Sequence, residues 1–235
     1  MDTWQAARWL ARNELKREFS AYIFAFVVTV LFGLFVATLY TDGVNYFSID
    51  IFYLMLLPSM GVAQSSVYFS FGYRKSDPFT RKLFFYRSLP ISTDTIVLSR
   101  FLLLALSHMI ITPVFLLLPY IGSEAFRELL EPGQFLLFMC IWFGYSLFCS
   151  SLHHFLEWST SGRVLFWTGG LIAMFILGMS MIVRAFGIST VAFTIQLAQD
   201  GPMYPIGILA MGFAGALFWK SATQKRIKRR DLHLD

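Results

Sequence analysis

Six long stretches of this chain contain no charged side chain, and this pattern limits the possible folds more than any other feature. A helix needs about 20 consecutive apolar residues to cross a bilayer. Lipid offers no hydrogen-bond partner to the backbone, so spanning segments of this kind must be helices. The six stretches are Ala21–Tyr40, Ile51–Tyr73, Phe101–Tyr120, Phe135–Leu152, Val164–Val183 and Pro202–Trp219.

The sequence therefore predicts an all-α integral membrane protein with a single membrane domain over residues 1–235. No connector reaches the roughly 50 residues that a separate globular domain usually needs. The segment at 185–201 is apolar but too short to span, and we expect a re-entrant or surface-lying outer segment there. Six transmembrane helices are expected at about 21–40, 51–73, 95–120, 135–156, 164–183 and 202–220, and a basic tail occupies 221–235.

The basic residues indicate how the spans are oriented. Most Lys and Arg residues lie in the N-terminal segment, the second connector and the tail, whereas the alternate connectors carry mainly acidic residues. By the positive-inside rule, both termini are predicted to be cytoplasmic. The net charge of +5 reflects this topology. We therefore expect the lipid membrane, and no nucleic acid, as the partner of the basic residues.

The N-terminal segment 2–18 has the pattern of an interfacial helix. Trp4, Ala7, Leu10, Ala11 and Leu15 form an apolar stripe, and basic residues recur four apart beside it. Such a helix lies in the headgroup plane, where Trp and basic side chains are favoured. The alternative is a plain soluble helix. The residues expected at the membrane surface are Trp4, Arg8, Trp9 and Arg12.

A few polar residues interrupt the apolar spans. Gln64, Ser65 and Ser66 lie in the second span and His108 lies in the third. Helix packing, with a neutral histidine bonded to a neighbour, is the ordinary interpretation. The alternative is that these four residues line a transport pathway. His153 and Glu157 have i, i+4 spacing, which is a weak metal pattern, so we expect neither a metal site nor a catalytic residue.

The second connector, Arg74–Arg100, has the features of a helix between two spans. Asp77 can cap a helix, Pro78 suits its first position, and Pro90 stops it, so a helix is predicted over 78–89. Its apolar face carries Phe79, Leu83 and Tyr86, and the surrounding basic residues are Arg81, Lys82 and Arg87. Such a helix either rests on the membrane or offers aromatic anchors to a soluble partner.

The residues Arg87-Ser-Leu-Pro-Ile-Ser92 and Thr95-Ile-Val-Leu-Ser-Arg100 resemble the second-to-third span connector of type-2 (ABC-2) ABC transporter permeases. The overall plan of an N-terminal interfacial helix and six spans is similar too. The resemblance implies a bacterial plasma membrane permease whose connector helix couples to an ATPase. The residues to which this coupling role carries over are Pro78, Phe79, Arg81, Lys82, Leu83, Tyr86 and Arg87.

The chain lacks the phosphate-binding pattern G-x-x-x-x-G-K-[ST], so we expect that it hydrolyses no ATP and binds no cofactor itself. ATP and Mg would be held by cytoplasmic ABC ATPase subunits, as two copies or a pair, and a second permease copy or paralogue is implied. Uncharged spans rich in Phe favour a hydrophobic or amphipathic substrate, such as a peptide, lipid or antibiotic, and the resemblance favours export. The alternatives are a secondary transporter and a non-transport membrane scaffold or immunity protein.

Overall fold

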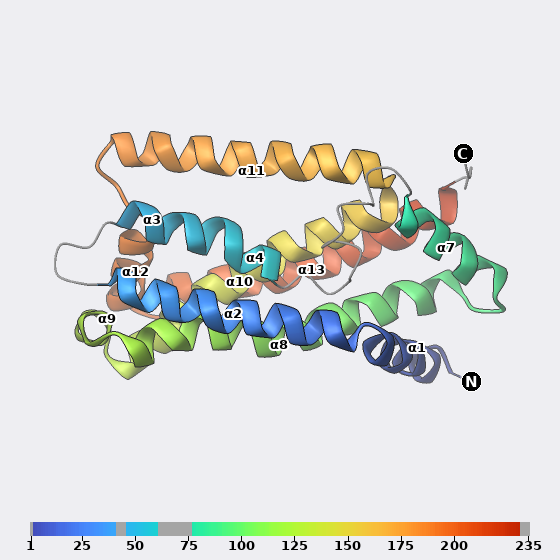
Figure 1. The fold of residues 1–235 in the computed structure, drawn as a ribbon, viewed down its shortest axis with the longest axis horizontal. Helices are drawn as coiled ribbons and strands as arrows, with labels where there is room; N and C mark the ends of the chain where they lie inside the picture. Colours follow the sequence, from blue (N-terminus) through green and yellow to red (C-terminus); the bar gives the residue numbers. More distant parts are fainter. Residues whose placement is uncertain (1, 41–45, 61–76, 231–235) are drawn as a thin grey trace.

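The computed structural model of the chain describes residues 2–40, 46–60 and 77–230, and these residues form helices joined by short connections. Helices α1 and α2 meet at Glu18, and a broken helical segment follows them. Figure 1 shows the long helices running side by side along the molecule. In the first third of the chain the elements are α1 (Thr3–Arg17), α2 (Phe19–Leu39), α3 (Tyr46–Ile51), the π-helical turn η1 (Phe52–Leu56) and α4 (Leu57–Met60).

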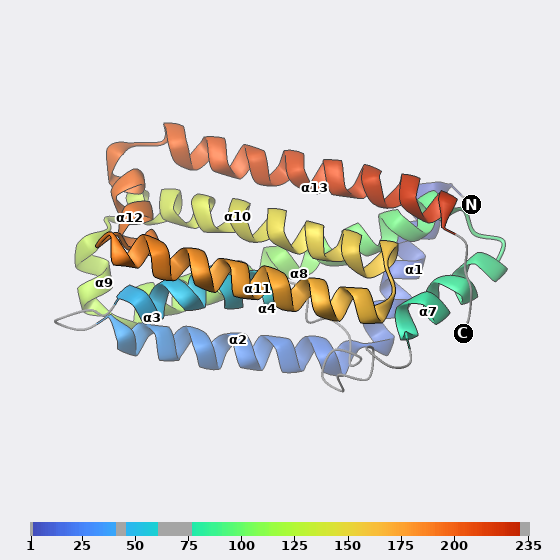
Figure 2. The ribbon, with the colours of Figure 1, turned by 90° about the horizontal axis from the view of Figure 1, so that it is seen from above.

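The rest of the described chain alternates long and short helices. The short helices α7, α9 and α12 lie at the two ends of the molecule (Figures 1 and 2). We call the end that carries α1 and α7 the α7 end, and the opposite end the α9 end. The remaining elements are α7 (Pro78–Ser88), α8 (Thr93–Gly122), α9 (Glu124–Leu129), α10 (Pro132–Ser159), α11 (Gly162–Ala185), α12 (Thr190–Asp200) and α13 (Met203–Arg229).

Five of the described helices are long and apolar enough to cross a membrane: α2, α8, α10, α11 and α13. They confirm an all-helical chain and five of the six expected spans. The expected second span at 51–73 differs, because its described part begins earlier, at Tyr46, and is broken by η1. Residues 61–73 lie outside the described part of the chain, so a sixth span stays a prediction.

Pro58 accounts for the irregular second helix. Proline has no N–H to donate to the carbonyl four residues earlier, which here belongs to Leu54. The hydroxyl of Tyr145 in α10 donates to that carbonyl at 2.8 Å, and the hydroxyl of Ser150 donates to the carbonyl of Pro58 at 2.9 Å. Tyr145 therefore replaces the hydrogen bond that Pro58 cannot donate, and Ser150 adds a second contact between α10 and this helix.

Helices α10 and α13 pack backbone against backbone through facing glycines. A Cβ built on Gly144 would lie 2.6 Å from the carbonyl oxygen of Ile208, and one on Gly212 would lie 2.6 Å from the Cα of Gly144. Real side chains essentially never approach backbone atoms this closely. The small residue at Gly212 therefore allows the close helix approach that the sequence predicts.

The small residues Gly169 and Ala173 in α11 do not form a close helix contact of this kind. A Cβ on Gly169 would meet no atom within 4 Å. The buried residues of α11 are Gly162, Leu165 and Ser180, so most of its surface has no protein neighbour. Figure 1 shows α11 as an outer layer beside the other helices. Gly169 therefore makes no close helix contact with the described residues.

The α9 end is held by an aromatic core and a buried carboxylate. Tyr53 lies edge-on to Phe138 and Trp142 within this core. The carboxylate of Asp50 accepts hydrogen bonds from Ser189 Oγ and from the backbone N–H groups of residues 190 and 191, at 2.7–3.1 Å. These bonds cap α12 and fix it to α3. Residues 185–201 thus contain a docked helix, and its re-entry into the membrane stays a prediction.

The α10–α13 contact gives a test of the fold. Replacing Gly212 with Leu should lower the free energy of unfolding by about 1–3 kcal/mol or more, because the helices must separate to admit the side chain. Gly207→Leu on the same helix is the matched control, since a Cβ there meets nothing within 4 Å. Unfolding in detergent measures both. Equal stability of the two variants would contradict the packing described here.

Candidate functional site: a buried charge cluster under helix α7

Helix α7 begins and ends as the sequence predicts. The Asp77 carboxylate caps it by accepting from the N–H of Thr80 at 3.2 Å and from its hydroxyl at 2.7 Å. Pro78 occupies the first helical position, and the helix ends at Ser88, two residues before Pro90. Asp77 has a positive φ of 38°, in the left-handed region that Asp tolerates better than most residues. The predicted helix over 78–89 is confirmed.

The apolar face of α7 points into the protein. Phe79, Leu83 and Tyr86 share one face, as predicted, and all three are buried. Leu83 and Tyr86 belong to a core cluster with Leu10, Ile96, Val97, Trp158 and Ile227. These three side chains are therefore unavailable as anchors for a soluble partner in this structure. The exposed side chains of α7 include Arg81, Phe84, Phe85 and Arg87.

A buried carboxylate joins α7 to the helices beneath it. Glu14 of α1 is only 5% exposed, and one of its oxygens forms ion pairs with both Lys82 and Arg100. Its other oxygen accepts from the Tyr86 hydroxyl at 3.3 Å, and Arg100 donates to the same hydroxyl at 2.9 Å. The Arg100 guanidinium also lies 4.6 Å from the ring centre of Trp158 in α10. We call these five residues the Glu14 cluster; they come from α1, α7, α8 and α10.

The electrostatics of the cluster depend on the cations Lys82 and Arg100 around the Glu14 carboxylate, with the buried Glu157 as a further nearby anion. Burial by itself would raise the pKa of Glu14, but the charges of Arg100 and Lys82 outweigh it and lower this pKa to about 2. Burial and the charge of Arg100 lower the pKa of Lys82 to about 8, although Glu14 opposes them. Glu14 is therefore ionised at neutral pH and compensates cations that burial would otherwise make costly.

A second contact ties α7 to the end of α13. Arg230, which directly follows α13, donates to the Trp158 carbonyl at 3.0 Å and to the hydroxyl of Thr80 in α7. Its own carbonyl accepts from Arg87 at 2.8 Å. The tail at 221–235 was expected as a separate basic segment, but residues up to 229 continue α13. Arg230 therefore links the end of α13 to both α7 and α10.

The predicted interfacial residues occupy the opposite face of α1. Arg8, Trp9 and Arg12 are exposed, while Ala7, Leu10 and Ala11 are buried, so the predicted division into two faces holds for these residues. Trp4 is an exception, since the sequence places it in the apolar stripe but it is exposed. Contact of this exposed face with a membrane surface stays a prediction.

His108 lies inside the helix bundle and is fully buried. Its Nε2 is 3.0 Å from the hydroxyl oxygen of Ser146, and its ring lies edge-on to Phe143. This is the packed, hydrogen-bonded histidine that the ordinary interpretation predicts. Gln64, Ser65 and Ser66 lie outside the described residues. Within residues 2–40, 46–60 and 77–230, no three His, Cys, Asp or Glu side chains gather in a way that could hold a metal ion.

Sequence reasoning missed Glu14 and Arg100 as members of the site. Glu14 continues the spacing of the buried residues Ala7, Leu10 and Ala11, so it is an acid on an apolar stripe. Arg100 lies inside α8, one helical turn after the buried Ile96 and Val97. A charge on a stripe that is otherwise buried indicates a buried partner of opposite sign, and this signal was present in both segments.

Replacing Glu14 with Gln should destabilise the protein by about 3–5 kcal/mol, because Lys82 and Arg100 would remain buried without their counter-charge. Thermal or denaturant unfolding in detergent measures this loss. Asp2→Asn makes the same chemical change at the exposed N-cap of the same helix and should have little effect. If Glu14→Gln and Asp2→Asn unfold alike, the Glu14 carboxylate does not stabilise the cluster.

Acidification should weaken the same contact. Because the pKa of Glu14 is lowered from 4.5 to about 2 in the folded protein, its ionised form stabilises the fold fully above pH 4.5. That stability, about 3 kcal/mol for the whole shift, is lost as the pH falls from 4.5 toward 2. Unfolding measured across this interval should show a steeper decline for the native chain than for Glu14→Gln. Parallel curves would contradict the assignment.

Comparison with known proteins adds no relative. No protein-family model, no curated protein and no solved structure matches this chain.

Proposed function

We propose that this protein is the membrane subunit of an ATP-driven ABC transporter, and that an ATPase on a separate chain docks on α7. The connector sequence Arg87–Arg100 supports this through its resemblance to ABC-2 permeases. Such a subunit lies in a bacterial plasma membrane with both termini in the cytoplasm, which places the α7 end on the cytoplasmic side. The basic residues of α1, α7 and the end of α13 at this end support that orientation.

The observation that carries the proposal is the way α7 is held. The Glu14 cluster fixes it to α1, α8 and α10, and Arg230 fixes it to the end of α13. A partner that pushes or pulls on α7 therefore acts on several membrane helices together. Coupling an ATPase to a membrane domain requires such a rigid connection, because a flexible loop would absorb the movement.

The surface that α7 offers to this partner is small and amphipathic. Phe84 and Phe85 are exposed beside Arg81 and Arg87. Aromatic and Arg side chains often carry most of the energy of a protein interface. In this proposal the buried residues Phe79, Leu83 and Tyr86 position the helix, and the exposed ones contact the ATPase.

The proposed assembly contains two membrane subunits and two ATPases. ATP and Mg are bound by the ATPases, and the membrane half is completed by a second copy of this chain or by a paralogue. The cargo is a hydrophobic or amphipathic molecule, moved outward. A secondary transporter is the second candidate, but the described cluster of buried charges lies beside α7 rather than midway along the spans, which favours coupling through α7.

A pull-down from native membranes in mild detergent tests the proposal. The tagged chain should co-purify with a soluble ATPase that has a phosphate-binding loop, and the membrane chains recovered would distinguish a homodimer from a heterodimer. Recovery of this chain without any ATPase, under conditions that keep other membrane complexes intact, would contradict the proposal and favour a stand-alone carrier or a scaffold.

The docking surface is tested by a pair of double variants. Phe84→Ala with Phe85→Ala should reduce ATPase recovery by at least about thirtyfold, the effect of losing a single hot-spot residue of roughly 2 kcal/mol. Phe186→Ala with Phe193→Ala removes two exposed aromatic side chains at the α9 end and should leave recovery unchanged. If ATPase recovery persists with the first pair, α7 is not the docking helix.

A further inference from the structure

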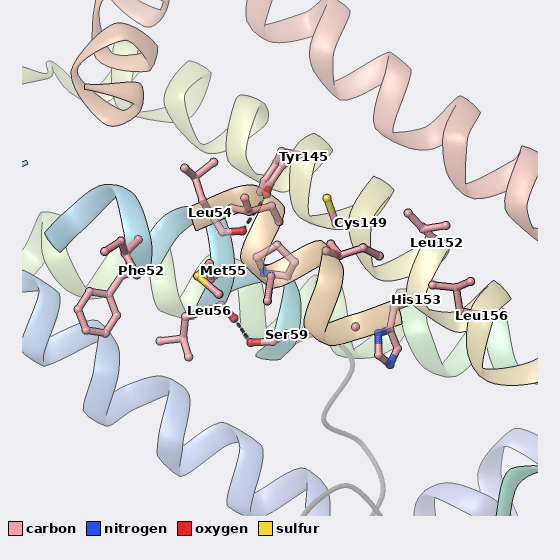
Figure 3. Close-up of a pocket in the computed structure, with 16 residues that line it drawn as sticks. Phe52, Leu54, Met55, Leu56, Ser59, Tyr145, Cys149, Leu152, His153 and Leu156 are labelled. Atoms are coloured by element: carbon pink, nitrogen blue, oxygen red, sulfur yellow. Dashed lines mark hydrogen bonds between the residues drawn. The ribbon is translucent and has the colours of Figure 1, made fainter. Parts of the chain in front are cut away.

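A cavity of about 660 Å³ lies between the broken second helix, α10 and α11. Figure 3 shows side chains from all three segments pointing into it. Sites for small organic molecules typically have volumes of about 300–1,000 Å³ and mainly apolar walls. The cavity therefore has the size of a binding site, and it is separate from the Glu14 cluster.

Three features of the sequence create this space. Pro58 follows the π-helical turn η1, which makes this wall irregular, and Tyr145 donates to the Leu54 carbonyl that Pro58 leaves free (Figure 3). On the opposite wall, Gly169 and Ala173 leave room where larger side chains would fill it. A Cβ on Gly169 meets nothing within 4 Å, so neighbouring helices do not close this space.

The described lining of the cavity carries no charged side chain and few polar ones. No Asp, Glu, Lys or Arg is among the described residues that line it, and their polar side chains are Ser59, Tyr145, Cys149 and His153. Figure 3 shows Phe52 toward the α3 side and His153 toward the other side, near the end of α10. A charged group would be desolvated here without a counter-charge, which is strongly unfavourable.

The polar atoms favour a ligand that donates a hydrogen bond. The Tyr145 hydroxyl donates to the Leu54 carbonyl, and the Ser59 hydroxyl donates to the Leu56 carbonyl at 2.7 Å. Each hydroxyl has therefore used its hydrogen; the Tyr145 hydroxyl also interacts with the Cys149 thiol, while the Ser59 oxygen can still accept. An uncharged hydroxyl or amide on the ligand matches this acceptor, and an apolar chain matches the remaining wall.

We propose that this cavity binds an elongated, uncharged amphiphile, with its apolar chain along η1 and α11 and its hydrogen-bonding head toward Ser59 and His153. The site would take such a molecule from the surrounding membrane. Its identification as the cargo site rests on the proposed transport function, whereas its existence as a binding site does not.

Photolabelling tests the site without an ATPase or nucleotide. The purified full chain is placed in phosphatidylcholine vesicles with a long-chain fatty alcohol that carries a diazirine, and labelled peptides are located by mass spectrometry. Label on the cavity residues of η1, α10 and α11 should be competed by unlabelled fatty alcohol. Label on exposed lipid-facing residues of α13, such as Leu217 and Phe218, should not saturate.

Filling the cavity from α11 gives the matched comparison. Gly169→Leu should reduce saturable labelling by about tenfold or more, equivalent to roughly 1.4 kcal/mol of binding free energy. Gly170→Leu makes the same change at the next residue, which is exposed and does not line the cavity, and labelling should persist. Ala173→Leu fills the same space independently, in case Gly169→Leu fails to fold.

The outcomes are distinct. Non-saturable labelling of the cavity would show that bulk phospholipid fills it, and labelling that both filling variants leave unchanged would show that the probe binds elsewhere. Either result overturns the proposed site. Neither depends on whether an ATPase co-purifies, so failure of this inference and failure of the transport proposal can be told apart.

Discussion

The Glu14 carboxylate is the interaction on which the α7 end depends. Lys82 of α7 and Arg100 of α8 both form ion pairs with this carboxylate, and the Tyr86 hydroxyl donates a hydrogen bond to it. Burying a charge away from water is costly unless an opposite charge compensates it. The cluster is therefore stable only while all its members are in place. A change in the position of α7 would therefore expose or unpair charges in α1 and α8. This all-or-none character makes α7 a part of the membrane domain rather than a loop attached to it.

Buried backbone groups in the middle of the molecule likewise need polar partners. Pro58 leaves the Leu54 carbonyl without its helical partner, and the Tyr145 hydroxyl of α10 provides the missing hydrogen bond. At the α9 end, Asp50 supplies acceptors to the first N–H groups of α12. In each case a polar group from a distant segment satisfies a backbone group that lipid could not. The irregular helices are therefore held in place by specific partners, and α10 fixes the wall of the cavity that η1 and α4 form.

Local features of the fold could be predicted from the sequence, and distant pairings could not. Asp77, Pro78 and Pro90 defined α7 because caps and breakers act within a few residues. Arg100 falls inside the span expected at 95–120, and α8 runs through it where a counter-charge is available. A buried charge at Glu14 indicates that a partner exists, but no local pattern identifies residues more than 60 positions away as that partner. Small residues such as Gly169 and Gly212 permit close packing, but they do not specify whether a neighbour is present.

The limited packing of α11 has a consequence for how the cavity responds to its surroundings. With few buried residues along its 24-residue length, this helix makes few contacts with the other described residues that would resist a change of tilt. Helices that span a bilayer adjust their tilt to the thickness of the hydrocarbon layer at small energetic cost. Because α11 forms one wall of the cavity, a change in its tilt would change the distance across it. We therefore expect lipids that thin or thicken the bilayer to change the space that a bound molecule would occupy.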